Sequence, residues 1–196
     1  MITQTIAIGK KQTVFVTKET NTTTTDLLTR MAKPTSYAEN NYNFMLTSGE
    51  GAINQELELL DDKQLRYGRS KKTPIAGRFN PGKFSFPTYI KTSPINGGSK
   101  LMAGEQDVIL RSALGTGTTI DAPSTKTQIK YNMNNVQNPS FTLWIKKDHT
   151  LFIGIGATIN TAKFDIKGSD VGMVNWDGEF MMMLIAGTSS LPDGVV

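Results

Sequence analysis

Apolar and polar residues alternate with a period of two through much of the chain, which is the pattern of β-strands that bury one face. The clearest example is residues 75–92. In this segment Phe84 and Phe86 fall on one side of the expected strand, and Ser85 and Tyr89 fall on the other. The pattern predicts an apolar face that packs on a core and a polar face that meets solvent or a neighbour.

A turn signal divides this segment. The Asn-Pro-Gly sequence at residues 80–82 combines a preset φ with a residue that accepts positive φ, which is typical of turns. We therefore expect residues 75–92 to form a β-hairpin, with Phe84, Phe86 and Ile90 packed towards a helix.

The same alternation predicts strands along the rest of the chain. A second hairpin is expected at residues 140–155, where two alternating runs flank a short polar connection, and a tight turn is expected at Asp177-Gly178. The other expected strands cover residues 2–9, 12–17, 53–60, 128–133, 162–167, 171–176 and 179–186.

Residues 104–114 carry the best helical pattern in the sequence. Glu105 and Asp107 lie in the expected first turn, where negative charge suits the helix dipole, and Gly115 provides a C-terminal stop. An amphipathic helix of this length is not stable alone, so we expect it to pack on a sheet. The fold is therefore expected to be mainly β with one flanking α-helix.

Residues 18–50 are polar and lack a clear period. We expect a loosely structured excursion from a single domain that spans residues 1–196, with Asp26 capping a short helical turn that ends before Pro34. A long loop inside a compact domain is uncommon and is usually functional. Contact with a neighbouring subunit would explain it.

The amino-acid composition mainly excludes certain kinds of functional site. The 196 residues include no cysteine and one histidine, which removes disulfides, thiolate metal sites and Cys/His nucleophiles. His149 and the pair Asp61-Asp62 fall in an expected turn and at an expected strand end, where we expect them to be solvated. We therefore expect no catalytic residue, no metal and no cofactor. The N-terminus lacks a signal-peptide pattern, and no apolar run approaches the ~20 residues of a membrane span.

A cluster of basic residues accompanies the net charge of +4. Such a cluster is typical of a surface that binds nucleic acid or another anion. It is also typical of a solvated loop or of one half of a charge-matched subunit contact. The cluster comprises Lys63, Arg66, Arg69, Lys71, Lys72, Arg78, Lys83 and Lys91.

The chain offers more two-faced strands than one helix can cover. The uncovered strand positions indicate sheets that are completed by neighbouring copies, which would also remove exposed strand edges. A ring satisfies this requirement, and rings with head-to-tail contacts extend into a tube.

Short motifs follow one another in a characteristic order between residues 50 and 187. They are QELELLDDK (55–63), IAGRF (75–79), FSFPTYI (84–90), the helix at 108–114, SFTLWI (140–145), His149, FDI (164–166) and the strand pair around Trp176-Asp177-Gly178. This order resembles the major tail tube protein of long-tailed bacteriophages. The polar stretch at residues 18–50 has no counterpart in that pattern.

The resemblance implies a β-sandwich or partly open barrel with one flanking helix, in a structural virion protein that is not an enzyme. Such proteins form hexameric rings that stack into a hollow tail tube, and long hairpins join between subunits into one inner barrel. The lumen would hold the tape-measure protein and later DNA during genome ejection. Tail terminator and baseplate or tip proteins would be further partners, and the protein would occupy the virion tail and, during assembly, the host cytoplasm.

By the same analogy, residues 53–60 with 75–90, and residues 140–155, would line the lumen, where acidic side chains would repel phosphate and let DNA slide. The segments 18–50 and 63–72 would make subunit or ring contacts. The candidates are Asn54, Glu56, Glu58, Ser85 and Tyr89 for the lumen, and Arg66, Arg69, Lys71 and Lys72 for the contacts.

Two other functions remain open. A virion decoration module, or a receptor- or carbohydrate-binding β-sandwich, could stack sugars on Trp144, Trp176 and Tyr89. Tryptophans within alternating strands more often pack in a core. An inner-tube protein of a contractile injection system would share the fold, and the sequence shows no signature of sheath contact.

Overall fold

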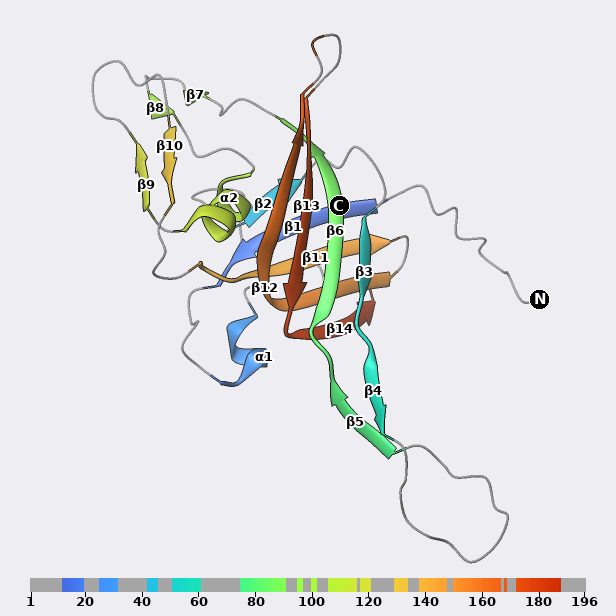
Figure 1. The fold of residues 1–196 in the computed structure, drawn as a ribbon. Coiled ribbons are helices and arrows are strands. Elements are labelled where there is room, and N and C mark those ends of the chain that lie inside the picture. The colour runs from blue at the N-terminus through green and yellow to red at the C-terminus, as the bar shows by residue number, and fades with distance from the viewer. Residues whose placement is uncertain are drawn as a thin grey trace, which may run out of the picture.

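The computed structural model is mainly β, with a curled main sheet and one helix of two turns packed against it (Figure 1). It describes residues 12–19, 25–31, 42–45, 51–60, 75–90, 95–96, 100–101, 106–115, 117–120, 129–133, 138–147, 150–166, 168 and 172–187.

The helices are α1 (Leu27–Arg30) and α2 (Asp107–Leu114). The strands are β1 (Gln12–Lys18), β2 (Tyr42–Met45), β3 (Ala52–Asn54), β4 (Leu57–Leu60), β5 (Ile75–Phe79), β6 (Gly82–Tyr89), β7 (Ile95–Asn96), β8 (Lys100–Leu101), β9 (Gly117–Ile120), β10 (Ile129–Asn132), β11 (Phe141–Lys147), β12 (Thr150–Asp165), β13 (Met173–Phe180) and β14 (Met182–Gly187).

The main sheet is divided into two parts that share β12. Its order is β2-β1-β11-β12-β13-β6-β3, and β14 also pairs with β12. Residues 150–157 of β12 pair with β11 and residues 150–155 with β14, whereas residues 158–165 pair with β13. Figure 1 shows β6 and β13 running across the direction of β1 and β11. We call β3, β6, β13 and residues 158–165 of β12 the front sheet, and the remaining strands of this sheet the back sheet.

The inner face of the front sheet packs with α2 and the back sheet around one apolar core. Phe84, Phe86, Trp176 and Ile109 are all at most 3% exposed and belong to this core. The predicted inward face of residues 84–86 is therefore confirmed. Ile90 is 38% exposed, so the prediction that it packs towards the helix is wrong.

The back sheet also buries its other face. Trp144 of β11 packs there with Leu151 and Ile155 of β12, and Leu27 of α1 covers them. The remaining apolar side chains of β11 point into the main core. The predicted pairing of the two strands within residues 140–155 is confirmed, although both faces of β11 are buried along residues 141–145.

Each buried tryptophan has a threonine partner. Trp144 Nε1 donates a hydrogen bond to Thr17 Oγ1 over 3.0 Å, and Trp176 Nε1 donates one to Thr88 Oγ1 over 2.8 Å. Both threonines are themselves buried. These bonds satisfy the indole N–H groups inside the core, where an unpaired donor would be costly.

Glu19 lies at the start of the stretch 18–50, most of which is outside the described residues, so the expected excursion stays a prediction. This residue is 2% exposed. Its carboxylate accepts hydrogen bonds from Ser140 Oγ at 2.6 Å, from Thr142 Oγ1 at 2.9 Å and from the backbone N–H of Gly156 at 2.9 Å. The start of this stretch is therefore bound into the back sheet, because a buried carboxylate needs such donors.

Two further parts of the same stretch are ordered elements. The predicted helical turn is present as α1, where Asp26 Oδ1 accepts a hydrogen bond from the N–H of Leu28 at 3.1 Å. Strand β2 pairs with β1 at the edge of the back sheet.

The predicted helix is confirmed as α2, with residues 104–105 outside the described residues. Asp107 accepts hydrogen bonds at 2.8 Å from both Arg111 Nε and the hydroxyl of Tyr131 on β10, the strand predicted at residues 128–133. Burial of Tyr131 and its bond to this carboxylate raise the pKa of the phenol well above its usual value. Gly115 ends the helix with φ of 98°, as its position predicts.

Residues 75–92 do not form the predicted hairpin. Strand β5 pairs with β4, and β6 pairs with β3 and β13, so β5 and β6 follow one another along one side of a longer hairpin. The pairing changes from Asn54 opposite Lys83 to Leu57 opposite Phe79, which places one extra residue on the β5–β6 side. The Asn-Pro-Gly sequence accommodates this bulge instead of reversing the chain.

Asp177-Gly178 does not form the predicted turn either. Strand β13 runs through both residues, and β12 joins two strands predicted separately at residues 151–155 and 162–167. A Cβ at Gly178 would collide with the ring of Phe84 and the carbonyl of Thr158. Glycine is thus required here for close packing between strands, and turning is not its role.

The face assignment of β6 predicts opposite outcomes for two adjacent substitutions. Phe86→Asp places a carboxylate in the main core and should lower the free energy of unfolding by more than about 4 kcal/mol. Ser85→Asp lies on the outer face and should change it by less than about 1 kcal/mol. Denaturant unfolding of both variants measures this. If only Ser85→Asp unfolds the protein, the two faces are inverted.

Candidate functional site

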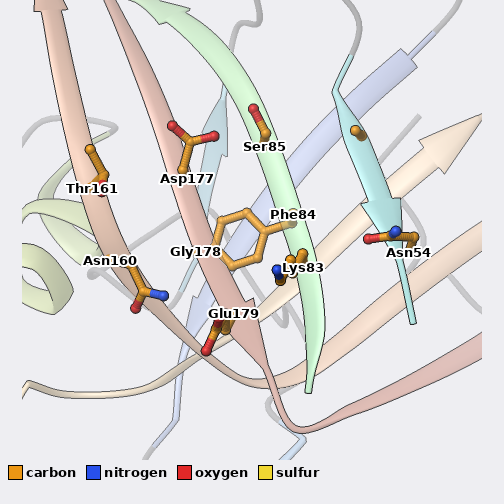
Figure 2. A pocket seen from close by; sticks show the side chains of 10 residues that line it. Asn54, Lys83, Phe84, Ser85, Asn160, Thr161, Asp177, Gly178 and Glu179 are labelled. Carbon is orange, nitrogen blue, oxygen red and sulfur yellow. The ribbon is translucent and has the colours of Figure 1, made fainter. Parts of the chain in front are cut away.

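The outer face of the front sheet is polar and holds a shallow hollow (Figure 2). Alternate residues of β6 and β13 point away from the core, so their polar side chains come together on this face. Figure 2 shows them beside polar residues of β3 and β12. The polar residues that line the hollow are Asn54, Lys83, Ser85, Asn160, Thr161, Asp177 and Glu179.

The charges on this face are mixed. The strand register places Lys83 between Glu179 on β13 and Asn54 on β3, and it places Ser85 opposite Asp177. Of the residues that line the hollow, two are acidic and one is basic. A surface of this composition lacks the excess of positive charge that holds nucleic-acid phosphates.

The structure brings together three of the five predicted lumen residues. Asn54 and Ser85 line the same hollow, and Glu56 lines an adjoining hollow together with Asn54. Tyr89 lies on the same face of β6 as Ser85, towards the other end of the strand. Glu58 is separate, on the β4–β5 ribbon, where it forms an ion pair with Arg78 at 3.6 Å.

Strands β12 and β13 also contribute to this face, which the alternation along β3 and β6 does not predict. Asp177 and Glu179 flank Gly178, a residue that in the sequence carries the signal of a turn. The available signal was the alternation of Asp177 and Glu179 with the buried residues Gly178 and Phe180, which continues the period of β13.

The second feature is a ribbon that projects from the body, which we call the arm. Strands β4 and β5 pair only with each other in the described part of the chain, and Figure 1 shows them extending away from the sheets. Large apolar side chains on the arm are exposed to solvent: Leu57 by 40%, Leu59 by 64%, Leu60 by 47% and Phe79 by 66%. A two-stranded ribbon of this kind is marginally stable by itself.

Gln55 fixes the root of the arm, a role that its sequence position did not reveal. Its Nε2 donates hydrogen bonds to the carbonyl oxygens of Asn80 at 2.9 Å and Met181 at 3.0 Å. Its Oε1 accepts one from the N–H of Met183 at 2.9 Å. One amide therefore joins both strands of the hairpin to the start of β14.

The remaining sequence candidates do not form a site among the described residues. Trp144 and Trp176 are buried at 1% and 0% exposure, so neither can stack on a sugar, and of the three proposed aromatics Tyr89 alone reaches the surface. His149, Asp61-Asp62, Arg66, Arg69, Lys71, Lys72 and the predicted strand at residues 2–9 lie outside the described residues.

Within the described ranges, no three His, Asp or Glu side chains come together as a metal site would require. None of the helices in that part of the chain is long and apolar enough to cross a membrane.

The role of Gln55 predicts a local effect of Gln55→Glu. This isosteric change replaces the amide N–H donor with a carboxylate oxygen that faces two carbonyl oxygens. The free energy of local unfolding at the arm root should therefore fall by about 1–3 kcal/mol. Amide hydrogen exchange should accelerate in residues 57–60 and 75–79. Asn54→Asp is the matched control, because it adds the same charge nearby without removing these bonds. Equal exchange in both variants would refute the role of Gln55.

No protein-family model matches the sequence, and comparison with curated protein sequences finds no significant match. The solved structures with a similar fold include the following three. A chain of the SPP1 tail tube has 10% identity and a TM-score of 0.54, covering 92% of this chain and 79% of that one. A chain of the anti-feeding prophage baseplate has 10% identity and a TM-score of 0.53, with 93% and 97% covered.

The third is a chain of the sheath–tube complex of PVC, an extracellular contractile injection system. It has 6% identity and a TM-score of 0.53, and the match covers 95% of this chain and 94% of that one. The protein therefore has a fold that is also found in the SPP1 tail tube, in the anti-feeding prophage baseplate and in the sheath–tube complex of PVC.

Proposed function

We propose that this protein is a structural subunit of a phage tail tube, in which hexameric rings stack around a lumen. One observation carries the proposal: the front sheet has an apolar inner face, a polar outer face and two unpaired edges. Among the described strands, β3 pairs only with β6, and residues 158–165 of β12 pair only with β13.

Unpaired strand edges are aggregation hazards unless they are covered, and closure into a barrel removes them. Front sheets placed side by side around an axis would pair β3 of one copy with β12 of the next. The polar outer faces would then line the lumen, and the apolar inner faces would stay packed on α2 and the back sheet.

The proposed lumen residues are Asn54, Glu56 and Ser85, joined by Lys83, Asp177 and Glu179. Strand β11, at residues 141–147, does not suit the lumen role suggested for residues 140–155, because its two faces are covered by the two apolar cores. The polar, slightly acidic outer face would let DNA or a tape-measure protein pass without strong attachment.

The fold shared with the SPP1 tail tube supports placement in a virion tail. By the same likeness, tail terminator and baseplate or tip proteins would meet the ends of the tube, and subunits would be made in the host cytoplasm. A role in structure and conduction requires no catalytic residue or cofactor.

An inner-tube protein of a contractile injection system is the second candidate. The likenesses to the PVC sheath–tube complex and the anti-feeding prophage baseplate favour it as strongly as the tail tube likeness favours the first. A sugar-binding module is disfavoured, because both tryptophans that could stack on a sugar are buried.

Purified protein should assemble into rings or tubes with a central channel. Negative-stain electron microscopy at high protein concentration and low salt should show them, and mass measurement of isolated rings should give six copies. Isolated monomers or trimers under these conditions would contradict tube assembly and would favour a decoration or binding module.

A further inference from the structure

Strand β6 is paired on both sides along only part of its length. It pairs with β13 through all eight of its residues, from Gly82 to Tyr89. On its other side, β3 pairs with residues 83–85 alone. Among the described residues, the part of β6 that follows Ser85 therefore has an open edge on the side of β3.

The hydrogen bonds show which backbone groups face this open edge. The N–H of Ile90 donates to the carbonyl of Gly172, the residue before β13, at 2.8 Å. In a strand between two partners, the backbone groups of alternate residues point to the same side, so the even-numbered residues of β6 face β13. The odd-numbered residues, which include Pro87 and Tyr89, therefore face the open edge.

Pro87 removes a donor from this edge. Proline has no backbone N–H, and since this position faces away from β13, the pairing of β6 with β13 loses no hydrogen bond. The carbonyl of Tyr89, the next outward residue, accepts a hydrogen bond from Gln106 Nε2 at 2.7 Å. The same Nε2 donates to Thr88 Oγ1 at 2.9 Å, which fixes the amide against the strand. A strand arriving at this edge would find one N–H missing and one carbonyl occupied.

The sequence around Pro87 explains why the edge needs to be closed. Residues 84–90 read Phe-Ser-Phe-Pro-Thr-Tyr-Ile and carry no charge, and they are flanked by Lys83 and Lys91. Uncharged segments of about seven residues with aromatic and β-branched side chains are typical of cross-β assemblies, and proline interrupts them. Part of this segment lies on an open edge of the folded protein, so it could pair with another strand without unfolding.

Side chains also cap outward backbone groups at two other positions of the front sheet. The N–H of Gly51, directly before β3, donates to Gln12 Oε1 at 2.9 Å. The N–H of Ile159 on β12 donates to Ser112 Oγ of α2 at 3.3 Å. Each of these caps occupies a single group, whereas Pro87 and Gln106 act on two successive outward residues of one strand.

We propose that Pro87 and Gln106 form an edge guard, which prevents a strand of a second copy of this chain from pairing with β6. The guard restricts strand addition on this side of the front sheet to β3, and it therefore selects where two copies can meet. The inference bears on the proposed pairing of sheet edges but goes beyond it, because the guard acts in the single subunit whether or not a tube forms.

Removal of the guard should turn β6 into a template for pairing. Pro87→Thr adds an N–H and a β-forming side chain, and Gln106→Met removes the amide from Tyr89 while keeping a side chain of similar length. The double variant should form fibres that bind thioflavin T at least about tenfold faster than the wild-type protein at equal concentration. Negative-stain electron microscopy separates such fibres from rings or tubes. Within the fibres, hydrogen exchange should be slowed at the amides of residues 87 and 89.

Two variants control for effects other than the open edge. Ser85→Thr places the same side chain on the same face of β6, at a position that β3 already covers. Ile145→Val, in the main core, lowers stability without changing either edge. Both should form fibres no faster than the wild-type protein. Pro87→Thr alone should lie between the wild-type protein and the double variant, and it carries the test if the double variant does not fold.

Each outcome bears on the guard. Fibre formation by the guard variants at the wild-type rate would overturn the proposal. Equal acceleration in Ile145→Val would assign the fibres to lost stability, and equal acceleration in Ser85→Thr would assign them to β-propensity, so either result would overturn it. Fibres in which residues 87 and 89 exchange freely would do the same. Absence of wild-type rings together with fast fibres in the guard variants would contradict the tube and support the guard.

Discussion

The structure depends on one strand that serves two sheets. Strand β12 pairs with β11 and β14 through its first residues and with β13 through its last, and the chain changes direction around Gly154 and Gly156. The ring of Phe180 packs over Gly154 and also over Gly82 of β6, where a side chain would collide with it. The carboxylate of Glu19 accepts a hydrogen bond from Gly156 and thereby fixes the backbone at the same place. Without this change of direction in β12, the two sheets could not enclose a common core.

The front sheet has an apolar inner face and a polar outer face. Its inner face is covered by α2 and the back sheet only in the middle, and its outer face is polar throughout the described hollow. Among the described residues, both edges of this sheet lack a strand partner, and apolar side chains are exposed at both of its ends. Pairing of these edges between copies, as proposed above, would complete the sheet.

The sequence predicted the elements better than their connections. The alternation around Phe84 and Phe86 gave the correct inward face, the spacing within residues 104–114 gave α2, and Asp26 gave the cap of α1. The two turns predicted from glycine were wrong in the same way. Gly82 follows a bulge and lies under Phe180, and Gly178 lies under Phe84, so both glycines make room for an aromatic ring from another strand.

The polar residues proposed for the lumen also divide into those that the sequence identified and those that only strand pairing revealed. Asn54 and Ser85 were identified from their own strands and do share a face, whereas Asp177 and Glu179 joined them only through the pairing of β13 with β6. Period and capping depend on residues a few positions apart, so the sequence by itself determined the strands, the helix and the side of β6 that is buried. Strand partners, the bend in β12 and the two uncovered ends of the apolar face depend on contacts between residues far apart in the chain. Only the tertiary structure decided those, because local sequence carries no information on which distant ring a glycine must accommodate.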